Sequence, residues 1–237
     1  VSRKQIGLNS VFKYSQWLQA AISNNMPYDQ FARELLTASG STITSPAGNY
    51  YRTAGETLDA MESTAQLFMG TRIQCAKCHN HPFERWTQSN YYGLASFFNR
   101  VERRKTDQPE EVILWSRNSG EVHHPADGRI MKPWVPVTGD LEIPNTADRR
   151  AALANWLTSP ENPFFARVEV NRIWAQVMGR GIVEPFDDFR DSNPPANAPL
   201  LDALAQDFVD HSFDRLHILR TILNSRTYQA DSRPNGF

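Results

Sequence analysis

Residues 57–88 decide how this chain is organised, and they read TLDAMESTAQLFMGTRIQCAKCHNHPFERWTQ. From Leu58 to Met69 apolar side chains recur at three- and four-residue spacing, which predicts an amphipathic helix. Gly70 follows directly, and glycine commonly ends helices because it tolerates a left-handed backbone. The predicted helix therefore ends just before residues 75–79, which read CAKCH.

Both cysteines of the chain lie in this C-x-x-C-H motif. The pattern is the attachment motif of c-type haem. Its two thiols can form thioether bonds to the two vinyl groups of one porphyrin, while the adjoining imidazole binds the iron. We therefore predict one covalent haem c, attached through Cys75 and Cys78, with His79 as the proximal iron ligand.

Two other interpretations use the same cysteines. Together with His79, His81 or His124 they can complete a zinc site, which would make the chain a structural or interaction module. Zinc modules, however, place their second ligand pair much further from the first than His79 and His81 lie. A redox-active dithiol is typical of a βαβ context, which the sequence does not show. The motif favours haem, and both alternatives stay open.

The second axial ligand of the iron has several candidates. His124 is the first, because a loop beside a predicted hairpin can carry it across the haem. Met69 is the weaker alternative, since a methionine on an apolar helical face usually belongs to the core. His81 is too close to the motif to reach the opposite haem face, and His211 and His217 are expected to be ordinary surface or core residues. Without a second ligand the iron would be five-coordinate, and a haem enzyme or sensor becomes the alternative function.

Helical periodicity extends over most of the remaining sequence, which predicts a mostly α fold. Helices are expected at 10–23, 27–38, 57–69, 87–98, 146–157, 164–178, 200–208 and 216–223. The charge run at 100–105 is expected to be the solvated end of one of these helices.

Residues 106–144 differ from the helical segments. They contain the β-prone run 112–115, and an Asp-Gly turn between 121–124 and 130–132 predicts a β-hairpin. We therefore expect three parts: a helical haem-binding part at 1–105, a β-hairpin and extended linker at 106–144, and a second helical part at 145–237.

Composition excludes several classes of protein. Of 237 residues, 25 are Lys or Arg and 26 are Asp or Glu, so no net positive charge exists to hold nucleic acid. The apolar runs are far shorter than the ~20 residues of a membrane span, and two cysteines exclude a disulfide framework. The chain begins at Val1 without a signal segment, so we expect a processed product or a piece of a longer protein.

The second helical part contains a dense group of polar side chains around a Gly-Arg-Gly turn. Its members are Asn171, Arg172, Glu184, Asp187, Asp188 and Arg190. Paired carboxylates can support acid–base chemistry or bind a cation. Structural ion pairing is the expected role, because no nucleophile or metal-ligand spacing accompanies them.

Two groups of segments resemble known families. The first group resembles the planctomycete cytochrome c-like domain family, and its segments are 25–31 (NMPYDQF), 34–38 (ELLTA) and 75–88 (CAKCHNHPFERWTQ). The second group resembles the domain of unknown function that usually follows that family, and its segments are 157–167 (LTSPENPFFAR), 170–172 (VNR), 179–185 (GRGIVEP) and 192–195 (SNPP).

The resemblance implies a large bacterial protein that is periplasmic, extracellular or associated with the cell surface, of which this chain is a fragment. It also implies a haem site at the C-x-x-C-H motif, and a His-Pro pair in the family corresponds to His124 and Pro125, which favours His124 as the distal ligand. We expect an electron-transfer protein rather than a catalyst. Its expected partners are a redox partner protein and other domains or subunits of a larger surface complex.

Overall fold

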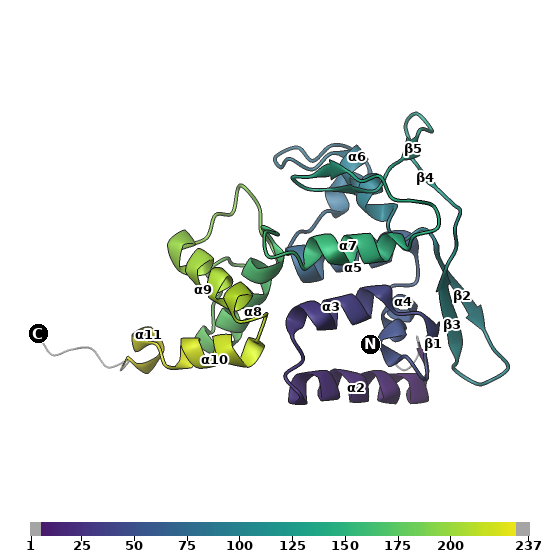
Figure 1. The fold of residues 1–237 in the computed structure, drawn as a ribbon. Helices are drawn as coiled ribbons and strands as arrows, with labels where there is room; N and C mark the ends of the chain where they lie inside the picture. The colour runs from purple at the N-terminus through teal and green to yellow at the C-terminus, as the bar shows by residue number, and fades with distance from the viewer. Residues whose placement is uncertain (1–5, 231–237) are drawn as a thin grey trace, which may run out of the picture.

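The computed structural model describes residues 6–230, in which helices predominate and three small antiparallel sheets lie beside them (Figure 1). The first half contains α2 (Leu8–Ser23), α3 (Tyr28–Thr37), α4 (Tyr50–Thr53), α5 (Thr57–Met69), α6 (Gln88–Ala95) and the 3-10 turns η1 (Pro46–Asn49) and η2 (Gln74–Lys77). The second half contains α7 (Arg149–Leu157), α8 (Phe165–Met178), α9 (Ala198–Asp210), α10 (Arg215–Leu223) and α11 (Arg226–Gln229). The prediction of a mostly α fold is confirmed.

Capping residues set the ends of the helices that flank the motif. α5 ends where Gly70 adopts a left-handed backbone with φ of 60°. α6 begins after Thr87, whose hydroxyl accepts a hydrogen bond from the Asn90 N–H in a capping box. α7 begins later than its expected cap at residue 146, because the Asp148 side chain accepts the Arg150 N–H and caps the helix instead.

The charge run at 100–105 is a strand, and the prediction of a helix end there was wrong. β2 (Val101–Lys105) pairs antiparallel with β3 (Val112–Ser116) along its whole length. The apolar strand β3 needs backbone partners on both edges, and β2 and the short β1 (Gly40–Ser41) supply them. Pairing with a neighbouring strand therefore overrides the local pattern of the charge run.

The predicted β-hairpin is present, and it packs on α6. β4 (Val122–His123) pairs with β5 (Ile130–Met131), and Gly128 in the turn has φ of 71°, which suits glycine. A second short pair, β6 (Trp134–Val135) with β7 (Gly139–Asp140), follows it. These strands lie near α6 at the end of the molecule that carries the motif (Figure 1).

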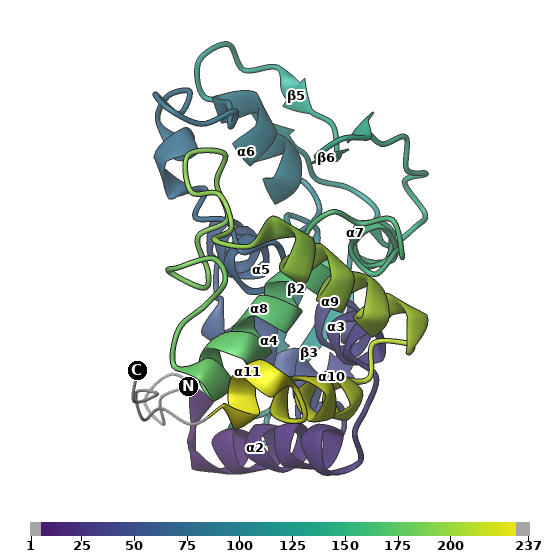
Figure 2. The ribbon, with the colours of Figure 1, turned by 90° about the vertical axis from the view of Figure 1, so that its left-hand side faces the viewer.

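One hydrophobic core runs through both halves of the chain. α7 packs against α3, and α8 packs against both α5 and α9 (Figure 2). Aromatic rings join these helices: Tyr28 of α3 stacks on Phe165 of α8 with ring centroids 4.8 Å apart, and Phe68 of α5 lies 5.9 Å from Phe165. The two predicted helical parts therefore stabilise each other by shared apolar burial.

In the part of the chain that the structure describes, no helix combines the length and the apolarity that crossing a bilayer requires.

Candidate functional site

The C-x-x-C-H motif forms a surface turn that is anchored to the core by the residue after its first cysteine. Cys75 lies in the 3-10 turn η2 and Cys78 directly follows it. Ala76 and the preceding Ile73 are fully buried, whereas both cysteines are exposed and free. The turn therefore leaves its two thiols at the surface while its small apolar side chain joins the core.

Helix α6 holds this turn from the other side. The Gln88 side chain donates to the Lys77 carbonyl at 2.9 Å, and the Gln88 N–H donates to Asn80 Oδ1 at 2.9 Å. The Tyr92 hydroxyl donates to the same Lys77 carbonyl at 3.3 Å. The Lys77 carbonyl before Cys78 and the Asn80 side chain after it are thus both bonded to α6.

His79 presents one ring nitrogen for metal binding. Its Nδ1 lies 2.7 Å from the Asn80 carbonyl oxygen. A carbonyl can only accept a hydrogen bond, so Nδ1 carries the proton and Nε2 keeps its free lone pair. This tautomer, with Nδ1–H bonded to a backbone carbonyl, is one that metal-ligating histidines commonly adopt. The exposed ring of His79 therefore has Nε2 available as a metal ligand.

His81 has a different role from His79. Its Nδ1 accepts backbone N–H groups from Phe83 at 3.2 Å and from Glu84 at 3.0 Å. Nδ1 is therefore unprotonated, and the proton of the neutral ring lies on Nε2, where it blocks metal binding. The ring therefore stabilises the turn after the motif.

His124 lies beside α6, and Tyr92 of that helix contacts both His124 and the motif. The His124 residue is 8% exposed, and its Nδ1 lies 3.3 Å from the Ala126 backbone nitrogen and 3.4 Å from Asp127 Oδ1. The Tyr92 ring meets it edge-on with centroids 6.1 Å apart, and the Tyr92 hydroxyl bonds the Lys77 carbonyl of the motif. The structure thus brings His124 to the helix that also holds the motif.

Met69, the weaker candidate for the second iron ligand, lies in the core. It is 1% exposed at the C-terminal end of α5. A haem that reached its sulfur would have to displace core side chains, which are packed as closely as in organic crystals.

The zinc alternative requires its ligands to converge. Within residues 6–230, no three of the motif's cysteines and the neighbouring histidines place their ligand atoms within 4.8 Å of one another. A closed zinc site needs four such atoms around one ion. Thioether formation has no such requirement, because each thiol bonds a different vinyl group.

The loop 184–195 of the second half contacts both flanks of the motif. Before the motif, Arg72 pairs with Asp187 at 2.6 Å. Burial opposes ionisation of this carboxylate, but its hydrogen bonds from Gln66 and Arg72 outweigh that effect and lower the pKa of Asp187. After the motif, the carboxylate of Glu84 accepts a hydrogen bond from the Ser192 hydroxyl.

In the polar group around the Gly-Arg-Gly turn, the expected ion pairing is confirmed for Asp188 with Arg190, whereas Arg172 pairs with Glu169 of its own helix. The buried Asn171 donates to the Val183 carbonyl at 2.9 Å and accepts the Val183 N–H at 3.0 Å, which fixes the loop to α8. The Asp188–Arg190 pair at 2.7 Å lies within the loop itself. These contacts position the loop that supports the motif.

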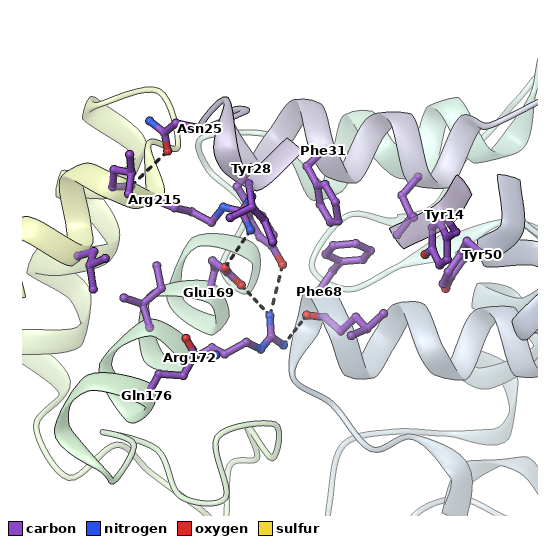
Figure 3. Close-up of a pocket in the computed structure, with 16 residues that line it drawn as sticks. Tyr14, Asn25, Tyr28, Phe31, Tyr50, Phe68, Glu169, Arg172, Gln176 and Arg215 are labelled. Carbon is purple, nitrogen blue, oxygen red and sulfur yellow. Dashed lines mark hydrogen bonds and ion pairs between the residues drawn. The ribbon is translucent and has the colours of Figure 1, made fainter. Parts of the chain in front are cut away.

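A cavity of about 480 Å³ lies between the two halves (Figure 3). Arg172 donates to the buried carboxylate of Glu169 at 2.7 Å and to the Tyr28 hydroxyl at 3.4 Å. Arg215 lies over the Tyr28 ring at 5.4 Å. Burial and the nearby Glu169 raise the pKa of Tyr28, so its hydroxyl stays protonated. Sequence reasoning missed this cavity because its walls come from several helices of both halves and no motif marks them.

Two family models match this chain. Residues 3–103 match PSCyt2, a protein of unknown function (DUF1549), and residues 149–236 match PSD1, a protein of unknown function (DUF1553). The PSCyt2 match precedes the PSD1 match along the chain, and the matched residues are called the PSCyt2 region and the PSD1 region below. The motif and η2 lie in the PSCyt2 region, while the supporting loop 184–195 lies in the PSD1 region. No curated protein and no solved structure matches the chain.

Proposed function

We propose that this chain is a c-type haem protein that transfers electrons outside the bacterial cytoplasm. The observation that carries the proposal is the state of the motif. Both thiols are exposed and free, and His79 keeps its Nε2 lone pair because Nδ1–H is bonded to the Asn80 carbonyl. The order of the PSCyt2 and PSD1 matches supports the resemblance on which the cytochrome expectation rests.

The residues of the turn suit the attachment of a haem. Cys75 and Cys78 would hold it covalently, and His79 would bind the iron on one side. Such a haem supplies one-electron redox chemistry at its iron. The chain's own contribution is to keep the imidazole oriented through the Asn80 carbonyl and to fix the turn through Gln88. An exposed attachment site also lets a redox partner protein approach closely.

His124 is the proposed ligand of the second iron face. Its Nδ1 lies 3.3 Å from the Ala126 backbone nitrogen and 3.4 Å from Asp127 Oδ1, so, unlike His81, this ring has a carboxylate that can accept a proton from Nδ1 and leave the Nε2 lone pair for a metal ion. Because Tyr92 packs against His124 and bonds the motif, a movement of His124 toward the motif would also have to move the Tyr92 ring. If His124 stayed in place, His79 would be the chain's one ligand to a bound iron, and the open position would suit a sensor or an enzyme.

The test is production of the full chain in bacteria that carry the c-type haem maturation machinery. We expect a coloured protein whose intact mass exceeds the polypeptide mass by one haem, with a c-type pyridine haemochrome spectrum. The double variant Cys75→Ser with Cys78→Ser should be colourless. His123→Ala, which removes an exposed histidine of β4 outside the motif, is the matched control and should keep the haem.

Other outcomes identify the alternatives. A colourless wild-type protein from cells that mature a reference cytochrome would overturn the proposal. One equivalent of zinc lost in the cysteine variant would instead identify a structural module. A haem spectrum that shifts with carbon monoxide would show an open iron position, and a spectrum indifferent to it would support pure electron transfer through a six-coordinate iron.

A further inference from the structure

Two histidines and an aspartate that are separated in sequence meet on the helical hairpin α9–α10. Asp207 and His211 lie one turn apart on α9 and its C-terminal cap, and His217 comes from α10. Among the His, Cys, Asp and Glu side chains of residues 6–230, these are the three whose metal-binding atoms all lie within 4.8 Å of one another. The two imidazole rings are stacked, with centroids 3.6 Å apart and planes 13° from parallel.

The carboxylate of Asp207 contacts both rings. His217 Nε2 lies 2.8 Å from Asp207 Oδ2, and His211 Nδ1 lies 3.1 Å from Asp207 Oδ1. His211 Nδ1 is also 2.8 Å from the Asp207 backbone carbonyl, so without an ion both ring nitrogens donate hydrogen bonds to Asp207, and an ion that binds these nitrogens takes the place of their protons. Two ring nitrogens and a carboxylate thus share one small volume, and each is placed there by a different part of the hairpin.

We propose that Asp207, His211 and His217 form a binding site for a divalent transition-metal ion of the Zn²⁺ class. Imidazole nitrogen and carboxylate oxygen are ordinary ligands of such ions. With Zn–N and Zn–O bonds of about 2.1 Å, tetrahedral ligand atoms lie about 3.4 Å apart. The nitrogen–oxygen separations of 2.8 and 3.1 Å are close to that value, so a rotation of side chains that separates the stacked rings accommodates the ion. Three protein ligands leave the fourth position to water.

The backbone turn between α9 and α10 places the three side chains together without a bound ion. Ser212 and Phe213, between α9 and α10, both adopt a left-handed backbone, with φ of 55° and 57°. Such a backbone is uncommon in non-glycine residues. It is kept in place because the Phe213 side chain is buried and its carbonyl accepts the Tyr28 N–H at 3.1 Å. The tight reversal brings His217 back over His211.

Hydrogen bonds at the start of α10 fix the second ligand-bearing helix. The Asp214 side chain accepts the His217 N–H at 3.0 Å and the Asn25 amide at 2.7 Å. The hairpin is therefore connected to the turn between α2 and α3. The ligand side chains themselves are 30–50% exposed, so they are free to rotate and an ion can enter from solvent.

A metal at this site would stabilise one wall of the cavity between the halves. α10 also carries Arg215, which lies over Tyr28 and 4.0 Å from Glu169 in that cavity (Figure 3). Crosslinking α9 to α10 therefore restricts the position of Arg215. The site shares no residue with the C-x-x-C-H motif, so the proposal stands whether or not the chain binds haem.

The experiment uses the full chain with Cys75→Ser and Cys78→Ser, which removes the thiolates that would also bind zinc. We expect one equivalent of Co²⁺ to bind and to give visible d–d bands, and Zn²⁺ to displace it. Zn²⁺ at ~100 times its Kd should raise the Tm by ~5–10 °C. His211→Ala and His217→Ala should each abolish the Co²⁺ bands and the Tm shift.

His123→Ala serves as the control because it removes an exposed histidine of β4, and it should leave Co²⁺ binding unchanged. Asp207→Asn tests the carboxylate separately and should weaken binding while the helical circular dichroism is unchanged. A chain that binds neither ion would overturn the proposal. So would a Tm shift that persists in both histidine variants, since the ion would then bind elsewhere.

Discussion

Replacing Gly70 by alanine should destabilise the protein through two separable effects. Gly70 has φ of 60°, and a left-handed backbone costs an L-residue about 1–2 kcal/mol. An added Cβ would also lie 2.6 Å from a ring atom of Phe189 and 2.9 Å from a methyl of Val168, both in the PSD1 region. Such overpacking costs about 1–3 kcal/mol. The smaller freedom of the unfolded alanine chain offsets about 0.4–1 kcal/mol of this loss.

Gly179 offers a matched control for this substitution. It also ends a helix with a left-handed backbone, φ of 75°, but no side chain or other segment lies within 4 Å of the position that an added Cβ would occupy. Gly179→Ala should therefore cost only ~0–1.5 kcal/mol, whereas Gly70→Ala should cost ~2–4 kcal/mol. For a chain of this size the larger cost corresponds to a Tm lowered by ~4–16 °C.

The assay is urea unfolding followed by far-UV circular dichroism, with thermal unfolding as a second measure. The free energies of unfolding of the two variants should differ by at least ~1 kcal/mol. Equal losses would refute the reasoning, because they would leave only the backbone effect and would mean that Phe189 and Val168 do not press on Gly70. A loss in Gly70→Ala accompanied by a smaller m-value would point to a partly opened native state.

Three further predictions concern the motif and one buried ion cluster. His79→Ala should keep the covalent haem but change its visible spectrum, and titration with carbon monoxide should show that the iron has an open position. An unchanged spectrum would show that His79 is not the proximal ligand. His124→Ala should convert a low-spin spectrum to a high-spin one, and no change would exclude it as the distal ligand. Glu121→Gln should cost ~2–4 kcal/mol at pH 7, because the buried Arg100 and Arg149 lose their partner. Burial opposes ionisation of the Glu121 carboxyl, but Arg149 and Arg100 outweigh this effect and lower its pKa below 4.5. The contribution of Glu121 to the free energy of unfolding is therefore fully present above pH 4.5 and is lost as pH falls through the lowered pKa. A stability difference between wild type and variant that persisted at about pH 2 in urea titrations would contradict this.

The helices and the motif could be predicted from the sequence because their determinants are local. The apolar spacing from Leu58 to Met69 and the following Gly70 define α5 without reference to the rest of the chain. Thr87 with Asn90 similarly defines the start of α6. The Asp-Gly turn located the hairpin β4–β5 for the same reason.

Features that depend on partners elsewhere in the chain were not predictable in this way. β2 exists because β3 offers it a backbone edge, and its charged sequence alone resembles a helix end. The meeting of His211 and His217 depends on a turn whose residues, Ser212 and Phe213, are not the usual ones for a left-handed backbone. The tautomer of His79 depends on the position of one carbonyl, which no motif specifies.

The contacts of the motif make the PSD1 region part of the haem-site proposal. A covalently attached haem needs no deep pocket to retain it, but a useful redox centre needs a fixed ligand geometry. That rigidity comes from Ala76 in the core, from Gln88 on α6, and from loop 184–195 on both flanks. Because the loop belongs to the PSD1 region, the two regions act as one structural unit around the motif. Their shared core and the Arg72–Asp187 pair give a physical reason for a PSCyt2 region to be followed here by a PSD1 region.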